Sequence, residues 1–476
     1  MIQNEIKKRV VVLGGGIGGL AAAYFLARLG RYDVTLIEKA SCVGGLCGSF
    51  QHQGFTLDYG AHKLYSVIPG ILDEVQSLMG DRLLRVAKKN RIFLRGQLLD
   101  YPLRLGNFAQ AMGLGLFAKL GADYGVEILR GLFPRSAARS YAEYITRRFG
   151  STAYRLVFEP LADKVWGRPD ELHPEMARTR VPASGGWEII LKLLGLKKET
   201  QETNAEFFYY PRDGFGALGE SLKKGIEQSG GKVLLNTSPT SILHEVDRAA
   251  HVMVNDGGAE HILPCDLLIS SIPVPEICRL VIGETDPELT KVVHALEYRH
   301  LVMVYVFIRQ PKVLEDQWIF FPERKFIFSR IFEQKQMNPD LGPIDQTVLC
   351  CDFTCDADSW QWQASEADLA RHCIEGLVNA GFIQSTDVMD TLVERRESFY
   401  PRYDLQYTDK MCSISQALQK TTNLLLTGRV GMYNYNNVDH CLDMGRFISQ
   451  KLMQGLSAGE VWRELDQRVG QYKIVD

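Results

Sequence analysis

The sequence predicts an α/β protein in which separated segments build one three-layer domain around a parallel sheet. A helical insertion and a β-rich domain complete the chain. Three observations carry this prediction. A strand, a glycine turn and a helix follow one another at the N-terminus; a second short strand ends in an acidic residue; and a buried strand near the C-terminus opens into another glycine turn and helix. At 476 residues the chain is long enough for several domains.

The N-terminal unit begins with a β-branched run at residues 10–13, which leads through a glycine turn into an apolar helix at residues 20–27. Each glycine has its own physical reason. Gly14 would make the tight turn, Gly16 would let backbone amides approach a pyrophosphate, and Gly19 would let the helix pack closely on the strand. The pattern is typical of a Rossmann-like dinucleotide-binding unit, in which the phosphates lie at the helix N-terminus.

The second strand, residues 34–37, supplies the parallel return that this unit requires, and it ends at Glu38. The Glu38 carboxylate would accept hydrogen bonds from the ribose hydroxyls. Its negative charge would repel a 2′-phosphate, so NADP is a poor candidate.

The segment after Glu38 carries a resemblance to a known family. A Gly44-Gly45 turn follows the acidic strand end, and residues 58–62 read Asp-Tyr-Gly-Ala-His. This order resembles the flavoprotein group that contains amine oxidases, protoporphyrinogen oxidases, phytoene desaturases and UDP-galactopyranose mutases. The resemblance implies an FAD cofactor, with the turn along the FAD and residues 58–62 beside the isoalloxazine. In this part of the chain it implies that the cofactor-binding residues are Gly14, Gly16, Gly18, Gly19, Glu38, Lys39, Gly45, Leu46, Gly60, Ala61 and His62.

Two later segments would complete the FAD domain. Residues 231–271 read as hairpin strands and a return strand, but Pro239 stands where the group usually has a valine whose backbone amide meets the adenine. Proline lacks that donor, so either the register slips by one residue or the adenine is held differently. Near the C-terminus a strand at 423–427 leads to a helix at 439–452. In this segment the resemblance implies three further cofactor-binding residues, Gly428, Arg429 and Asp439.

These segments predict three regions. The FAD-binding domain would consist of residues 1–65, 206–290 and 420–476. Residues 66–205 would form the helical insertion, and residues 291–419 the β-rich substrate-binding domain.

The substrate would be met by residues of the insertions. In chain order these clusters look like the active-site segments of UDP-galactopyranose mutases. That resemblance implies that Arg180 and Arg330 contact a diphosphate, because planar guanidinium groups match phosphate oxygens. The implied substrate-binding residues are Trp166, Arg180, Arg299, Arg330, Tyr400 and Tyr435, and the implied catalytic residues are His62, Arg330, Arg429 and Tyr435. Taken singly, each arginine is more often in a surface ion pair, and Trp166 is more often a core residue.

Other features resemble different members of the group. Residues 209–216 and 316–322 look as much like protoporphyrinogen-oxidase-like and desaturase-like proteins, and the apolar stretch at 108–144 would suit a lipid entering from a membrane surface. The favoured function is an FAD-dependent oxidoreductase that transfers hydride to flavin N5 from a glycosyl diphosphate or sugar-lipid. The alternatives are a redox-neutral mutase, a desaturase or oxidase of an isoprenoid or porphyrin-like substrate, and a flavin-binding scaffold without turnover.

Composition limits the partners and the location. The net charge of −3 and the pI near 6.4 argue against nucleic acid as a partner, and no metal-ligand spacing is found. The ten cysteines read as reduced, mostly buried thiols. The N-terminus has no room for an apolar signal region, which predicts the cytoplasm. No run of about 20 apolar residues predicts a spanning helix. The apolar stretch at 103–133 leaves peripheral contact with the inner face of a membrane open. Nothing in the sequence indicates an oligomeric state.

Overall fold

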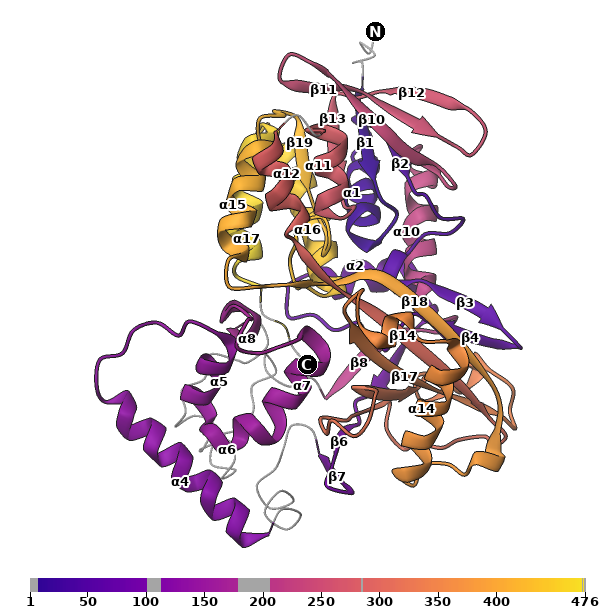
Figure 1. Ribbon diagram of the computed structural model, residues 1–476. Helices are drawn as coiled ribbons and strands as arrows, with labels where there is room; N and C mark the ends of the chain where they lie inside the picture. Colours follow the sequence, from indigo (N-terminus) through magenta and orange to yellow (C-terminus); the bar gives the residue numbers. More distant parts are fainter. Residues whose placement is uncertain (1–6, 101–112, 179–205, 284–285, 473, 475–476) are drawn as a thin grey trace.

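The computed structural model describes residues 7–100, 113–178, 206–283, 286–472 and 474. Three regions can be followed in Figure 1: a parallel sheet with its helices, a β-rich region beside it, and a group of helices beyond both. All ten cysteines are free, and seven of them are buried, as predicted.

The parallel sheet has five strands in the order β19-β13-β1-β2-β9. Its central pair is in register from Lys8 opposite Tyr32 to Leu13 opposite Ile37. The buried parts of the strands are mainly apolar because helices cover both faces, as is usual for parallel sheets. They come from three distant parts of the chain: β1 Lys8–Leu13 and β2 Tyr32–Ile37, β9 Lys232–Leu234 and β13 Leu267–Ser270, and β19 Leu424–Leu426.

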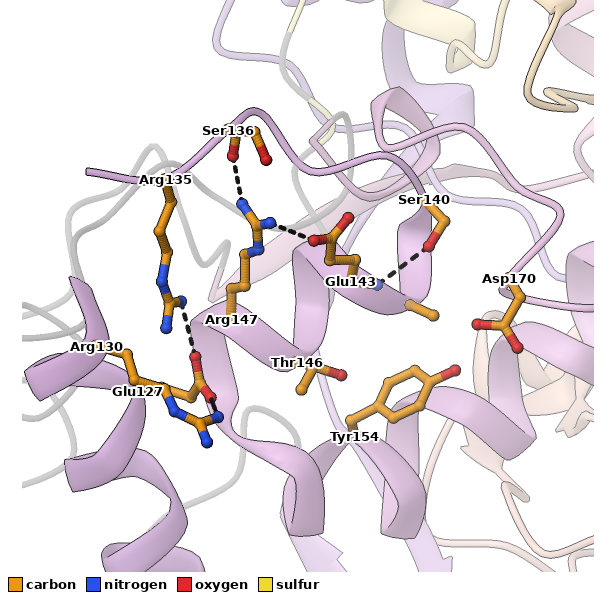
Figure 2. Close-up of a pocket in the computed structure, with 11 residues that line it drawn as sticks. Glu127, Arg130, Arg135, Ser136, Ser140, Glu143, Thr146, Arg147, Tyr154 and Asp170 are labelled. Atoms are coloured by element: carbon orange, nitrogen blue, oxygen red, sulfur yellow. Dashed lines mark hydrogen bonds and ion pairs between the residues drawn. The ribbon is translucent and has the colours of Figure 1, made fainter. Parts of the chain in front are cut away.

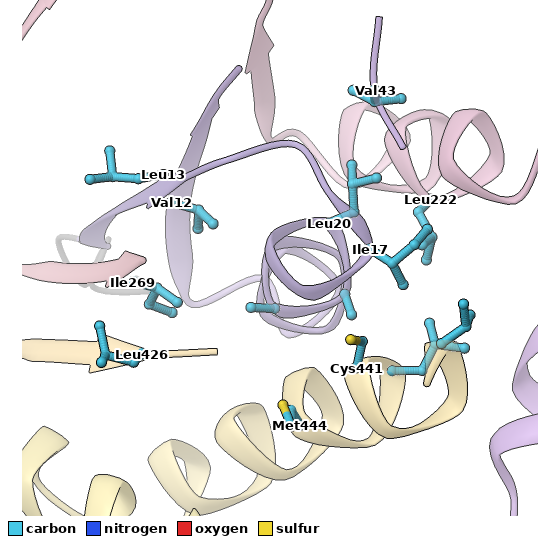
Figure 3. Packing of buried hydrophobic residues seen from close by; sticks show 14 of the residues in the cluster. Val12, Leu13, Ile17, Leu20, Val43, Leu222, Ile269, Leu426, Cys441 and Met444 are labelled. Atoms are coloured by element: carbon cyan, nitrogen blue, oxygen red, sulfur yellow. The ribbon is translucent and has the colours of Figure 1, made fainter. Parts of the chain in front are cut away.

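Helix α1 (Ile17–Ala27) is buried along its whole length between α10 (Gly216–Gln228) and α16 (Val438–Met453). Small side chains make this possible. A Cβ atom at Gly445 of α16 would lie 2.5 Å from the carbonyl carbon of Ala21. Figure 3 shows the apolar side chains that fill the remaining space between the sheet, α1 and α16. The surrounding helices are α2 Ile71–Met79, α11 Val274–Val281, α12 Pro287–His294, α15 Tyr407–Leu418 and α17 Ala458–Val469.

Between β9 and β13 the chain forms a separate three-stranded antiparallel sheet of β10 (Ser238–Glu245), β11 (Arg248–Asn255) and β12 (Glu260–Pro264). Pro239 lies opposite Val254, and the register shifts immediately after it. The irregularity is consistent with a residue that cannot donate a ladder hydrogen bond.

The β-rich region is a seven-stranded sheet in the order β18-β14-β17-β16-β15-β6-β7, with α14 (Glu366–Asn379) packed against β14 and β18. Most of its strands come from the predicted segment: β14 Glu297–Ile308, β15 Trp318–Phe320, β16 Arg330–Glu333, β17 Thr347–Cys355 and β18 Val388–Arg402.

The predicted helical insertion, residues 66–205, also contains strands between residues 83 and 100. These residues form β5 (Leu83–Ala87), β6 (Asn90–Leu94) and β7 (Gln97–Asp100). Strands β6 and β7 form a hairpin through a turn at Arg95 and Gly96, whose φ angles are 54° and 78°. β6 pairs in parallel with β15, and β5 pairs with β8 (Phe207–Pro211). Both pairings join segments more than a hundred residues apart.

The remaining regular elements of that insertion are helices where it is described. Its helices are α4 Leu114–Gly131, α5 Tyr141–Phe149, α6 Ser151–Ala153, α7 Glu159–Trp166 and α8 Glu175–Arg178, with a π-helical turn at Tyr154–Phe158. Helix α4 packs against α5 and α6 and lies along the outer edge of the molecule in Figure 1. Lys164 of α7 joins this group to the β-rich region, because its Nζ donates to the carbonyl oxygens of Phe321, Glu323 and Phe328 at 2.7–2.9 Å.

Candidate functional site

The glycine turn between β1 and α1 has one open side. Gly14 has a φ of 97°, and a Cβ atom at Gly19 would lie 2.0 Å from the Gly14 carbonyl oxygen, so both are required by the local fold. A Cβ atom at Gly16 would meet no protein atom within 4 Å. At Gly18 it would lie 2.6 Å from Cα of Gly428, so the C-terminal segment packs directly on this turn. Gly16 therefore faces the space where a ligand can approach the backbone.

An acidic side chain lies beside this turn. Glu38 at the end of β2 accepts hydrogen bonds from the Gly15 amide (2.6 Å) and the Ala40 amide (2.8 Å), and Lys39 next to it is exposed. The N-cap of α1 is Gly16, and no side chain caps it. An open glycine face, uncapped helix amides and an acidic strand end are the groups that hold the pyrophosphate and ribose of a dinucleotide. The residues present therefore fit the ADP part of a dinucleotide cofactor.

The second glycine turn lies against the first. The Gly44 amide donates to the Gly15 carbonyl oxygen at 2.8 Å, and a Cβ atom at Gly45 would lie 3.1 Å from Cα of Gly16. The next residue, Leu46, accepts a hydrogen bond at its carbonyl oxygen from Nε2 of His62 at 2.9 Å. This chain of contacts brings the two predicted glycine turns and His62 together.

His62 is held as a neutral imidazole. Its Nε2 faces the carbonyl oxygens of Leu46 and Tyr59, the latter at 3.2 Å, so this nitrogen carries the proton. Burial, together with the positive charges of Arg429 and Arg330, lowers the pKa of His62 to about 4. His62 follows Gly60, whose φ is 109°, and the half-buried Ala61. Because the proton is on Nε2, the His62 Nδ1 can accept a hydrogen bond at neutral pH.

Arg429 lies among aromatic rings. Its Nε and Nη2 donate to the Asn436 carbonyl oxygen at 2.9 and 2.7 Å. Its guanidinium carbon is 5.3 Å from the ring centre of Tyr400 and 5.7 Å from that of Tyr435, and these two rings stack at 4.6 Å. Trp166 meets Tyr435 edge-on at 6.2 Å. We call Trp166, Tyr400, Arg429 and Tyr435 the Arg429 cluster. It unites four of the residues singled out from the sequence.

Two other predicted arginines are engaged with carboxylates. Arg330 of β16 lies opposite Asp352 of β17, and its Nε is 3.0 and 3.2 Å from the two carboxylate oxygens. Burial opposes the Arg330 charge, but Asp352 outweighs burial and raises the pKa of Arg330. Arg299 pairs with Asp356 at 2.5 Å and lines a different cleft of about 360 Å³, although it lies opposite Tyr400 in the β14–β18 ladder. Their charges are largely compensated within the protein.

Two predicted residues remain. Asp439 lies in the first turn of α16 and is buried, which raises the pKa of its carboxyl group; a hydrogen bond from Ser66 opposes this. A buried acid, Asp439, therefore stands at the N-terminus of α16, the helix that follows the turn carrying Arg429. Arg180 lies outside the described residues, as do residues 103–112 of the apolar stretch.

Asp58 was not among the predicted site residues, yet it supports the segment that carries His62. Its carboxylate accepts hydrogen bonds from Ser49 Oγ and Tyr210 Oη at 2.5 Å and from the Phe215 amide at 3.0 Å. Burial raises its pKa to about 6 although these bonds lower it. The Asp58 backbone amide donates to Gln334 Oε1, and its carbonyl oxygen accepts a hydrogen bond from Tyr305 Oη, both in the β-rich region. An acid that ends a short strand two residues before a glycine is the sequence signal for this position.

A wider pocket of about 570 Å³ lies in the helical insertion between α4 and α5 (Figure 2). Its lining contains Arg130, Arg135 and Arg147, but Glu127 and Glu143 pair with these arginines, and Asp170 adds a third acid. None of the predicted site residues lines this pocket. It is therefore separate from the Arg429 cluster.

Comparison with known proteins agrees with the geometry. Residues 12–78 match a family model described as an NAD(P)-binding Rossmann-like domain. The phytoene desaturase of Fusarium fujikuroi is 26% identical over 296 residues, which is 56% of this chain and 50% of that protein. The chain thus spans about half the length of the curated relatives it matches.

Solved structures match over almost the whole chain. A reduced UDP-galactopyranose mutase has a TM-score of 0.83 at 20% identity and covers 98% of this chain and 100% of its own. A putrescine oxidase variant has a TM-score of 0.66 at 13% identity and covers 94% and 100%. The predicted α/β fold, with a Rossmann-like parallel sheet and a β-rich domain, is confirmed, and the fold is one that flavoenzymes of the amine oxidase and UDP-galactopyranose mutase group share. None of the helices in the described ranges has both the length and the apolar character needed to cross a bilayer.

Proposed function

We propose that this chain binds FAD and is an oxidoreductase. The observation that carries the proposal is the continuous line of groups from the open face of Gly16, through Gly45 and Leu46, to His62 and Arg429. The first part of that line fits the pyrophosphate of a dinucleotide, and the last part faces a cluster of aromatic and cationic side chains. Bound flavin would supply hydride acceptance at its N5 position.

The residues of the Arg429 cluster would bind and orient the substrate. Arg429 donates its hydrogen bonds to a neutral carbonyl oxygen and not to a carboxylate. Its positive charge is therefore available to an anionic group of the substrate. The stacked Tyr400 and Tyr435 and the edge of Trp166 offer a water-excluding wall. A neutral His62 would accept a hydrogen bond at Nδ1 near pH 7 and would not act as an acid there.

The substrate class that suits these groups combines an anionic group with a sugar or an apolar body. A glycosyl diphosphate or sugar-lipid meets this description. Because Asp352 and Asp356 already neutralise Arg330 and Arg299, Arg429 is the cation of the three best able to meet the substrate phosphate. The likeness to phytoene desaturases keeps an apolar isoprenoid as an alternative substrate.

A redox-neutral sugar mutase is the second candidate. It is favoured by the combination of Trp166, Arg429 and Tyr435 in one cluster, which joins a guanidinium group with aromatic surfaces suited to a nucleotide sugar. In that reaction no net electrons would pass to an acceptor. The paired state of Arg330 is the observation that weighs against it.

An anaerobic absorbance titration of the purified yellow protein separates these candidates. A glycosyl diphosphate or isoprenoid that bleaches the oxidised flavin without added reductant would establish the oxidoreductase. A flavin that stays oxidised with all of them, together with interconversion of UDP-galactose ring forms only after dithionite reduction, would establish the mutase. A protein that purifies without flavin absorbance and does not take up FAD would overturn both.

A further inference from the structure

Helix α4 presents its acidic side chains to the protein and, near its C-terminal end, apolar side chains to the outside. Asp123 accepts hydrogen bonds from the Thr152 amide at 2.9 Å and from Ser151 Oγ at 2.8 Å, at the beginning of α6. One turn later, Glu127 is 9% exposed and pairs with two arginines, Arg130 at 2.8 Å and Arg135 at 3.0 Å (Figure 2). The polar face of α4 is therefore already satisfied inside the insertion.

The opposite face is unusually apolar for a surface. Val126 is 44% exposed, Leu129 62%, Leu132 75% and Phe133 73%. Val126 and Leu129 are three residues apart and share one side of the helix, and the adjacent Leu132 and Phe133 follow directly after its end at Gly131. We call these four residues the α4 corner. Large apolar side chains gathered in this way mark a surface that another phase or molecule covers.

The charge around the α4 corner is positive. Residues 127–148 contain five arginines and two glutamates, a net charge of +3, whereas the whole chain has a net charge of −3. Leucine and phenylalanine beside arginines are the composition of helices that lie in the interface of an anionic membrane. A basic surface on an acidic protein also orients the molecule toward such a membrane.

We propose that the α4 corner docks on the surface of an anionic lipid bilayer. Leu129, Leu132 and Phe133 would enter the interfacial region, and the exposed Arg139 would meet a lipid phosphate. The contact is shallow, since the described helices include none able to cross a bilayer. The same insertion carries Trp166 of the Arg429 cluster, on α7. The docking does not rest on the proposed reaction.

Sedimentation of the full-length holoprotein with vesicles tests the docking. The vesicles are made of phosphatidylcholine alone or of phosphatidylcholine mixed with phosphatidylglycerol. We expect binding to the mixed vesicles that falls with added salt. The double variant Leu132→Ser with Phe133→Ser should lower the partition coefficient at least about tenfold, because two large apolar side chains no longer enter the interface. The matched control is Val246→Ser with Ile344→Ser, which changes two side chains that are 101% and 90% exposed elsewhere on the surface; it should bind like the wild type.

The charge contribution is tested with Arg139→Glu against Arg463→Glu, since both arginines are exposed and only the first lies near the α4 corner. Weaker binding of the first alone supports the proposal. Equal binding of wild type and the Leu132/Phe133 variant, or no binding of wild type to mixed vesicles, overturns it. A wild-type dimer that the Leu132/Phe133 variant converts to a monomer would show instead that the α4 corner joins two copies of this chain. Flavin absorbance and the melting temperature verify that each variant is folded.

Discussion

The contrast between Gly16 and Gly18 gives a direct test of the cofactor site. Gly16 has φ −69° and ψ 169°, a conformation open to any residue, and its Cβ position is empty. Gly16→Ala should therefore leave the apoprotein as stable as before, or more stable by about 0.4–1 kcal/mol because the unfolded chain loses freedom. The added methyl group would stand where the pyrophosphate approaches. A steric cost of about 1–3 kcal/mol predicts FAD binding weaker by roughly tenfold to a hundredfold.

Gly18→Ala is the matched control, because its Cβ atom would lie 2.6 Å from the backbone of Gly428. It should lower the stability of the apoprotein by about 1–3 kcal/mol whether or not FAD is present in solution. The assay pairs FAD fluorescence quenching with thermal unfolding of the apoprotein. If Gly16→Ala keeps its FAD affinity within about twofold while its apoprotein melts normally, the pyrophosphate does not pass Gly16 and the reasoning fails.

Three further predictions concern single side chains. Arg429→Met should retain FAD absorbance but lower kcat/KM for an anionic substrate by roughly tenfold to a hundredfold; unchanged kcat/KM in steady-state assays would remove Arg429 from the site. Because the pKa of Asp58 is raised in the folded state to about 6, folded protein holds the proton more tightly than unfolded protein, and stability should fall as pH rises from 4 to 6. Relative to Asp58→Asn, this loss should be roughly 3 kcal/mol in denaturant titrations at several pH values, and parallel pH profiles for the two proteins would contradict it. Lys164→Met leaves three partly buried carbonyl oxygens without their shared donor and should lower the free energy of unfolding by about 2–4 kcal/mol in urea. A loss below about 0.5 kcal/mol would mean that water replaces Nζ.

The glycine motif was predictable because its constraints are local. The turn at Gly14 and the close packing at Gly19 depend on residues within one short segment, so the pattern of strand, turn and helix is enough to recognise them. Gly18 is different. Its need for glycine comes from Gly428, more than four hundred residues later, and no spacing rule links the two positions.

The partners of the predicted arginines also could not be read from the sequence. Their order in the chain matched a family pattern, but their partners depend on how strands align. The register of β16 with β17 brings Arg330 opposite Asp352, and the fold brings Arg299 to Asp356, so two of the predicted substrate cations are paired within the protein. Arg429 differs because the turn that carries it returns to its own Asn436 carbonyl oxygen.

The sequence by itself determined the elements whose signal is periodic or local: the two glycine turns, the strand that ends at Glu38, the buried C-terminal strand and the helix after it. Only the tertiary structure decided that β6 and β7 extend a sheet built mostly from residues 297–402, that Asp58 holds the His62 segment, and that the apolar side of α4 faces outward. The physical reason is that strand pairing and burial depend on contacts between residues far apart in the chain, whereas turns and helices are specified by their neighbours.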